Sequence, residues 1–253
     1  IDIVKLAKKK KIKLIEDCSQ AHGAKINKSS VGSFGDVAAW SFCQDKIIST
    51  GGEGGMVTTN SKKIYKFIWS YKDHGKNQLK YFKKSNNSYF KYIHENEGSN
   101  YRLTEIQSLL GRIHTKKLDS YCKKRNKVSN TIINGLKKYK VLQFQKIPIN
   151  FTHAYYKLYI TLNIEFLKTN IDNKYFLDYL KKNNIPSSQG TCPEIYLEKS
   201  FKKESNKITT RFKNAKYLGE YSFAINITNL YTIKDCKYIV SKISNLCKII
   251  SIN

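Results

Sequence analysis

The sequence predicts an α/β fold divided into two domains. Short apolar segments with strand character alternate with amphipathic helical segments, and one long helical pattern lies near the middle of the chain. With 253 residues, 40% of them apolar, the chain can bury one large core or two modest cores. We expect a first domain over residues 1–124 and a smaller α/β domain over residues 125–253, with the boundary inside the long helix.

The first domain is predicted to alternate helix and strand from its first residues. Residues 3–7 place apolar side chains on one helical face. Three apolar segments predict short strands, at residues 12–15, 38–42 and 56–59. A glycine-rich loop at 51–55 precedes the third strand, and Asn60 or Ser61 is suited to cap the helix that follows it.

The longest helical pattern follows a polar segment at 81–98, which we interpret as a loop or lid. Thr104 and Gln107 fit a capping box at the start of this helix, and apolar residues at helical spacing continue to about Leu136. The second domain is predicted to contain strands at 153–162 and 221–227, and helices at 176–182 and from Thr232 onward.

The net charge of +27 is the most unusual bulk property of the chain. Such a charge suits a nucleic-acid or membrane-surface protein, or a lysine-rich solvated surface. The lysines are spread along the chain, only residues 8–11 form a compact run, and arginine, the better bidentate ligand of bases and phosphates, is scarce. We favour the solvated surface and expect no specific nucleic-acid partner and no membrane partner.

The cysteines and the absence of a membrane or secretory segment in the sequence favour a cytoplasmic location. No apolar run approaches the ~20 residues that a membrane span needs, and no apolar secretory signal is recognisable. The first residue is Ile1 rather than Met, so we expect a fragment or a processed chain. The six cysteines form neither C-x-x-C pairs nor zinc-type spacing with the five histidines. We therefore expect free thiols, a cytoplasmic location and no metal site.

Three chemically useful side chains follow the predicted strands of the first domain. Asp17 lies at the end of one strand, Ser41 near the end of the next, and Lys46 shortly after it, before the glycine-rich loop. Because ligands collect at the carboxyl ends of strands in α/β sheets, these groups are expected to meet in one crevice. Pyridoxal phosphate needs such a set. A buried carboxylate holds the proton on its ring nitrogen, a lysine amine forms its Schiff base, and hydroxyl and backbone N–H groups bind its phosphate.

Each of these residues also has a more ordinary interpretation. Asp17 can cap a helix, Ser41 can satisfy a local backbone group, and Lys46 can be one more solvated charge. His22 more often fills a structural role than carries a proton. The joint order and spacing of the set favour the cofactor site.

The same segments resemble the DegT/DnrJ/EryC1/StrS aminotransferase family. The matching stretches are residues 15–24 (IEDCSQAHGA), 32–36 (GSFGD), 41–46 (SFCQDK), 52–60 (GEGGMVTTN), 73–75 (DHG), 98–103 (GSNYRL) and 190–199 (GTCPEIYLEK). The resemblance runs from residue 1 to about residue 220 and is most specific in its first half.

The resemblance implies a fold-type-I pyridoxal-phosphate enzyme, with a three-layer αβα large domain that is incomplete at its N-terminus and a smaller C-terminal α/β domain. It implies a homodimer with shared active sites. It also implies transfer of an amino group, commonly from glutamate, to a nucleotide-linked keto-sugar, for cell-surface polysaccharide or related amino-sugar biosynthesis.

The family's cofactor contacts carry over to matching positions of this sequence. Lys46 would carry the cofactor and shuttle the proton, and Asp17 would pair with the pyridine nitrogen. Gln20 would contact the side of the ring that bears the phenolic oxygen. Ser41 would bind the phosphate, and Asn100 would reach the phosphate of the neighbouring subunit's cofactor.

Substrate contacts by His22 and Arg102 are weaker carry-overs of the same resemblance. A dehydratase branch of the family replaces the lysine by histidine, so Lys46 disfavours that branch.

The sequence departs from the family pattern in two places. The phosphate loop and stacking aromatic residue that family members carry upstream have no counterpart here, and residues 224–229 lack the expected His-Pro stretch.

Two rival functions remain open. The chain can be a sensor or regulatory protein that keeps the fold and the cofactor without transferring amines. It can also be a basic nucleic-acid binder, which would show tight and steeply salt-dependent binding.

Overall fold

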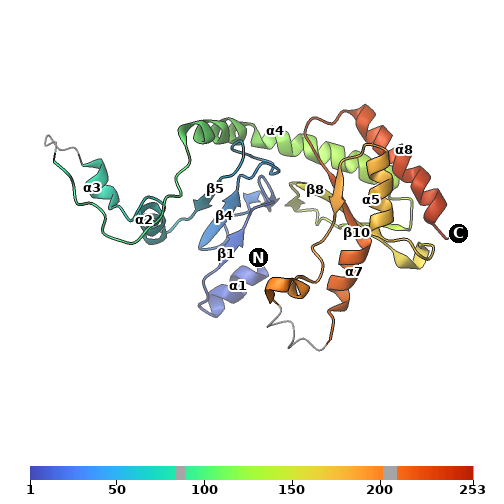
Figure 1. Cartoon of the computed structure of the whole chain (residues 1–253), viewed down its shortest axis with the longest axis horizontal. Coiled ribbons are helices and arrows are strands. Elements are labelled where there is room, and N and C mark those ends of the chain that lie inside the picture. Colours follow the sequence, from blue (N-terminus) through green and yellow to red (C-terminus); the bar gives the residue numbers. More distant parts are fainter. Residues whose placement is uncertain (84–88, 202–209, 253) are drawn as a thin grey trace. The chain divides into compact units, whose positions relative to one another are not determined.

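The computed structural model describes residues 1–83, 89–201 and 210–252 and confirms the mixed α/β fold (Figure 1). The chain divides into two compact units. One contains Ile1–Asp119 and Asn150–Thr152, and the other contains Ser120–Ile149 and His153–Asn253. The division falls within the long helix α4 (Glu105–Leu136).

A three-stranded sheet in the order β1–β4–β5 belongs to the first unit (Figure 1). β1 (Ile15–Asp17) runs parallel to β4 (Val37–Ser41), with Asp17 opposite Ala39. β4 pairs antiparallel with β5 (Gly55–Thr58). Because parallel strands end at the same edge of a sheet, the residues that follow β1 and β4 emerge side by side.

The first strand begins later than the predicted position at residues 12–15. The helix α1 (Asp2–Lys9) ends in a turn at Lys11, which adopts a φ of 55°. The Ile12 amide donates back to α1 at 2.9 Å, so the turn uses residues that were expected in the strand. Pairing with β4 starts only at Ile15.

The first unit also contains a small sheet and the helix that follows β5. The small sheet has the order β3–β2–β7 and contains β2 (Lys25–Ile26), β3 (Ser29–Ser30) and β7 (Phe151–Thr152). Ser61 caps α2 (Lys62–Tyr71), because its hydroxyl accepts the Ile64 amide at 3.3 Å, which confirms one of the two predicted caps.

The segment at 81–98, expected to be a loop, contributes its first residues to the short helix α3 (Gln78–Phe82). The amide oxygen of Asn77 caps this helix by accepting the amides of Leu79 and Lys80. Residues 84–88 of the expected loop lie outside the described part of the chain.

The predicted capping box at the start of α4 is confirmed. The Thr104 hydroxyl accepts the Gln107 amide at 3.3 Å, and the Gln107 side chain accepts the Thr104 amide at 3.0 Å. The helix ends at Leu136, as the apolar spacing predicts.

The second unit is built on a four-stranded antiparallel sheet in the order β6–β8–β10–β9. Its strands are β6 (Leu142–Phe144), β8 (Lys157–Leu162), β9 (Ser187–Gln189) and β10 (Ser222–Asn226). Its further helices are α5 (Asn173–Lys182), α7 (Lys213–Tyr221) and α8 (Ile233–Ile250), with short 3₁₀ turns at Ile164–Phe166, Ile195–Leu197 and Lys199–Phe201. Thr232 caps α8 in a capping box with Asp235.

β8 is shorter than the strand predicted at 153–162. Tyr155 adopts a left-handed φ of 47°, and the buried Arg125 donates to the carbonyls of Tyr155 and Tyr156 at 3.0 and 2.7 Å. A guanidinium that binds these carbonyls keeps residues 155 and 156 out of a sheet ladder, so the strand starts at Lys157.

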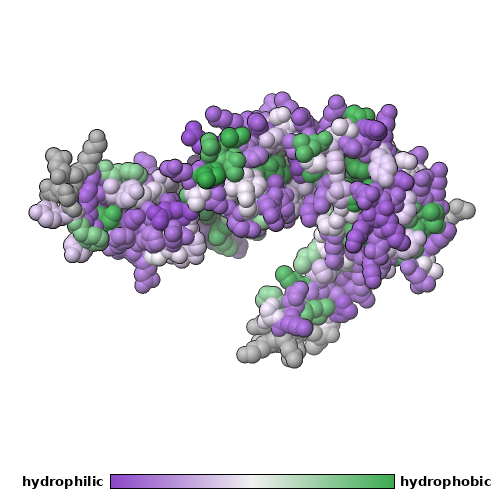
Figure 2. Space-filling model, turned by 45° about the horizontal axis from the view of Figure 1, so that its top comes forward, coloured by the Kyte–Doolittle hydropathy of each residue, from purple (hydrophilic) through white to green (hydrophobic). Residues whose placement is uncertain are grey.

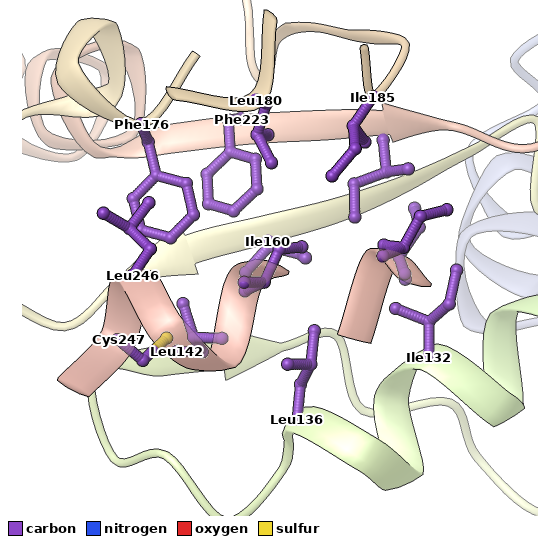
Figure 3. Packing of buried hydrophobic residues seen from close by; sticks show 14 of the residues in the cluster. Ile132, Leu136, Leu142, Ile160, Phe176, Leu180, Ile185, Phe223, Leu246 and Cys247 are labelled. Carbon is purple, nitrogen blue, oxygen red and sulfur yellow. The ribbon is translucent and has the colours of Figure 1, made fainter. Parts of the chain in front are cut away.

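The apolar core of the second unit joins its sheet to its helices (Figure 3). Phe176 of α5 stacks on Phe223 of β10 with ring centroids 4.4 Å apart, and both side chains are fully buried. Ile160 of β8 and Leu246 of α8 complete the packing. This cluster is the main source of stability of the second unit.

The first unit buries less apolar surface. Its Ile3, Phe67 and Ile106 are 70%, 66% and 75% exposed. The face of the molecule in Figure 2 is mostly hydrophilic, with apolar patches in between. Within the described residues, no helix combines the length and apolar character that crossing a bilayer requires. All six cysteines are free thiols.

His22 is the buried polar residue next to the first unit's sheet. Its ring is 2% exposed and lies 5.4 Å from the ring of Trp40 and 5.9 Å from that of Phe42. Burial lowers the pKa of His22 to about 4, although a hydrogen bond with the Ser41 backbone acts in the opposite direction. His22 is therefore neutral at pH 7.

Replacing Phe176 by Ala is expected to lower the free energy of unfolding by about 3–5 kcal/mol, because the change leaves a cavity in a fully buried aromatic pair. Urea unfolding followed by circular dichroism measures this loss. The matched control is Tyr175→Ala, one position away and 44% exposed, which should cost less than about 1 kcal/mol. Equal losses for the two variants would contradict the described core.

Acidification should destabilise the wild-type chain more than a His22→Gln variant. As pH falls from 6.5 toward 4, the unfolded chain takes up a proton on His22 before the folded chain does. The stability due to the neutral ring is thus complete above pH 6.5 and is lost toward pH 4, by up to about 3 kcal/mol. Urea titrations of both proteins at pH 7 and pH 4.5 measure the difference, and identical pH dependence would argue against this assignment.

Candidate active site

Asp17 is the last residue of β1, and its carboxylate is fixed by the turn that follows. The hydroxyl and the amide of Ser19 both donate to Oδ1, the amide at 3.0 Å. These two hydrogen bonds are the main cause of the lowered pKa of Asp17, and the charge of Lys46 lowers this pKa further. The carboxylate is therefore ionised at neutral pH, as a group that holds a proton on a pyridine nitrogen must be.

The expectation that Asp17 is buried was wrong for this chain. The residue is exposed: along β1, Ile15 and Asp17 are exposed and Glu16 between them is half-buried, since neighbouring side chains of a strand face opposite sides of the sheet. Its ionisation depends on the hydrogen bonds from Ser19 rather than on a closed pocket.

Lys46 follows β4 and lies close enough to Asp17 to influence its pKa. The Lys46 amide closes a turn by donating to the Cys43 carbonyl at 3.0 Å. Its side chain is 14% exposed, and the amino group forms an ion pair with Asp45 at 3.3 Å. The charge of Lys46 also contributes to the lowered pKa of His22. The structure thus brings Lys46, Asp17 and His22 into one neighbourhood.

Ser41 ends β4 and is half-buried, and its hydroxyl oxygen accepts the Cys43 amide at 3.3 Å. A serine that accepts one local bond still has its own proton to donate to a phosphate oxygen. Gln20 is exposed in the turn after β1, three residues beyond Asp17. Ser41 thus lies at the carboxyl end of β4, and Gln20 lies just beyond the carboxyl end of the paired strand β1.

The glycine-rich loop is held against the end of β4 by its backbone. The Phe42 amide donates to the Gly54 carbonyl at 2.8 Å, and the Thr50 hydroxyl donates to the Glu53 carbonyl at 3.1 Å. A Cβ at Gly54 would collide with the Thr50 side chain, and Gly51 has a φ of 85°. The loop therefore needs glycine both for its close packing and for its turn.

Glu16 is a structural residue of the site that the sequence did not reveal. Its carboxylate accepts three backbone amides, those of Gly32, Phe34 and Gly35, at 2.7, 2.7 and 2.6 Å. The bonds tie the segment before β4 to β1. The one available signal was the position of Glu16 beside Asp17, since neighbouring residues of a strand face opposite sides of the sheet.

Asn100 and Arg102 belong to a second cluster, around the buried carboxylate of Asp73. Arg102 donates through Nε to Asn100 Oδ1 at 3.0 Å and forms an ion pair with Asp73 at 3.4 Å. The Lys76 amino group donates to the same Asp73 oxygen at 3.0 Å. Asn100 and Arg102 were predicted from the sequence as site residues, whereas their partners Asp73 and Lys76 were not.

The residues near β1 and β4 fit pyridoxal phosphate in their chemistry. They combine the ionised carboxylate of Asp17, the amine of Lys46, the hydroxyl of Ser41 and a glycine-rich loop packed against the end of β4. In the described part of the chain, no group of three or more His, Cys, Asp or Glu side chains is arranged to hold a metal ion.

Comparison with known proteins supports the same conclusion. Residues 2–244 match the DegT/DnrJ/EryC1/StrS aminotransferase family. An uncharacterized protein of Methanocaldococcus jannaschii is 28% identical over 254 residues, which cover 100% of this chain and 64% of that protein. The UDP-N-acetyl-3-dehydro-alpha-D-glucosamine 3-aminotransferase of Acidithiobacillus ferrooxidans is 32% identical over 161 residues, which cover 64% of this chain and 40% of that enzyme.

A solved structure extends the likeness to three dimensions. The X-ray structure of the aminotransferase from Psychrobacter cryohalolentis is 36% identical and superposes with a TM-score of 0.91, over 98% of this chain and 65% of that one. This chain spans less than two thirds of the length of each of these relatives. By the family match over most of its residues, the chain belongs to the DegT/DnrJ/EryC1/StrS aminotransferase family.

Proposed function

We propose that this chain provides the cofactor-binding residues of a pyridoxal-phosphate-dependent sugar aminotransferase. The reaction moves an amino group from an amino acid, with glutamate as the expected donor, to a nucleotide-linked keto-sugar. The observation that carries the proposal is the placement of an ionised Asp17 and a half-buried Lys46 near each other, at the ends of the paired strands β1 and β4. The family itself is dependent on pyridoxal phosphate.

Each residue of the site has a task in this proposal. When bound, pyridoxal phosphate supplies an electron sink for the charge that develops at the donor α carbon. Lys46 would hold the cofactor through its amino group and, once released, take the proton from the α carbon. Asp17 would keep the proton on the ring nitrogen through a charge-assisted hydrogen bond. Ser41 would donate to the phosphate, and Gln20 would contact the ring on the side of its phenolic oxygen.

A nucleotide-linked keto-sugar is the substrate class that the relatives favour. The Acidithiobacillus relative is named for an amino transfer that involves a UDP-linked sugar. The net charge of +27 favours association with such an anionic substrate. Arg102, whose side chain is 44% exposed, is suited to a substrate contact, whereas the burial of His22 favours a packing role.

The assembly and setting are further parts of the proposal. Asn100 would reach the cofactor phosphate of a neighbouring subunit in a homodimer with shared active sites. We place the domains at residues 1–124 and 125–253, in a cytoplasmic enzyme that serves cell-surface polysaccharide or related amino-sugar synthesis.

Lys46→Ala is expected to abolish both the cofactor that borohydride can trap and the turnover, because no other group of the proposed site offers an amine. Mass spectrometry of the reduced full-length protein and a coupled transaminase assay measure the two effects. Lys13→Ala removes an amine whose side chain is 83% exposed and should leave both unchanged. Turnover retained by Lys46→Ala would exclude the proposed role of Lys46.

Glutamate alone should convert the bound cofactor stoichiometrically, with a change in its absorbance, and a nucleotide-linked keto-sugar should reverse the change. This behaviour follows from a reaction in two half-steps with ping-pong kinetics. Stopped-flow spectra with UDP-, GDP- and dTDP-linked keto-sugars test the order of the steps and the nucleotide. A protein that binds the cofactor but shows no change with any amino donor would instead be a sensor or regulatory protein.

A further inference from the structure

Asp73 is a buried carboxylate for which the proposed function has no task. The residue is 4% exposed. Its carboxylate accepts a hydrogen bond from Lys76 and forms an ion pair with Arg102. Burial alone would raise the pKa of Asp73, but the hydrogen bond from Lys76 and the charges of Lys76, Arg102 and Lys72 lower it by more. The carboxylate is thus ionised, and both of its cationic neighbours are oriented by it.

The backbone around Asp73 is fastened to the segment that carries Asn100. Asp73 and Asn100 form an isolated antiparallel bridge. The His74 amide donates to the Ser99 carbonyl at 3.1 Å, and the Ser99 amide donates to the Tyr71 carbonyl at 2.7 Å. These bonds fix the main chain of residues 99–100 relative to the turn that follows α2.

Two glycines allow this close approach. Gly75 has a φ of 75°, and a Cβ at this position would overlap the carbonyl of Asn96. A Cβ at Gly98 would overlap the amide of Gly75. Because main chain lies directly against main chain, the two segments are held in one register.

Arg102 links the carboxylate to the Asn100 side chain. Its Nε donates to Asn100 Oδ1 at 3.0 Å, while its NH1 lies 3.4 Å from Asp73. Since Nε can only donate, the atom that faces it is the amide oxygen of Asn100. The amide nitrogen of Asn100, with its two protons, then points away from Arg102 and is available to donate to an anion.

We propose that Asp73 is a positioning residue for phosphate binding. It orients Arg102, and Arg102 in turn orients the Asn100 amide so that its N–H groups can donate to the cofactor phosphate. This inference rests on the proposed function, because it assumes that Asn100 meets that phosphate. Asp73 itself touches neither cofactor nor substrate in this scheme.

The test compares pyridoxal phosphate with pyridoxal, which lacks the phosphate. Asp73→Asn should raise the apparent Kd of the full-length protein for pyridoxal phosphate about tenfold and leave that for pyridoxal unchanged, because only the phosphate contact is lost. Asn100→Ala should give the same pattern, and the double variant should show no further loss. Absorbance titration of the lysine-bound cofactor measures each Kd, and circular dichroism checks that each variant is folded.

Arg102→Lys provides a second route should Asp73→Asn fail to fold. Lysine keeps the positive charge near Asp73 but cannot contact Asp73 and Asn100 at once as the guanidinium does. The Kd for pyridoxal phosphate should therefore rise as in Asp73→Asn, and the Kd for pyridoxal should stay unchanged. The matched control is Glu95→Gln. The Glu95 carboxylate forms an ion pair with Lys80 and accepts a hydrogen bond from Asn77, with no bond to Arg102. Removing its charge should therefore change neither Kd.

Each other outcome overturns the inference. If Asn100→Ala weakens pyridoxal phosphate while the Asp73 and Arg102 variants do not, Asp73 has no positioning role and the proposed function stands. If the variants weaken both ligands equally, the role of Asp73 is purely structural. If the wild-type protein binds neither ligand, the proposed function fails together with this inference.

Discussion

The parallel pairing of β1 with β4 determines where every candidate cofactor residue near Lys46 lies. The register sets Asp17 opposite Ala39, so the turn after Asp17 and the loop after Ser41 leave the sheet at the same edge. An amine and a carboxylate that are far apart in sequence thereby come within electrostatic reach of each other. A shift of one residue in this pairing would turn Asp17 to the other face of the sheet and separate the two groups.

Hydrogen bonds to backbone, more than apolar burial, shape the surroundings of this edge. Glu16 gathers three amides of the segment that leads into β4, and the glycine-rich loop is bound to the end of β4 by carbonyl and hydroxyl contacts. The second unit is stabilised differently, through the apolar cluster around Phe176 and Phe223. The proposed cofactor residues thus lie in the unit with less buried apolar surface, where polar contacts fix the loops.

Local signals made much of this structure predictable. The capping box at Thr104, the end of α4 and the start of α8 after Thr232 follow from patterns within a few residues. Features that depend on contacts distant in sequence were missed or wrong. The partners of Glu16 lie 16 to 19 residues along the chain, and Arg102 lies far in sequence from Asp73. No sequence period encodes such contacts. The late start of β1 has a local cause, the turn after α1, which the apolar pattern did not reveal.

The close approach of Gly75 to Gly98 has a consequence for the chain that follows it. The chain between these two glycines leaves and returns at points that are fixed to each other. A change of sequence between the two glycines therefore need not move Asn100, whose main chain is held by its own bridge to Asp73.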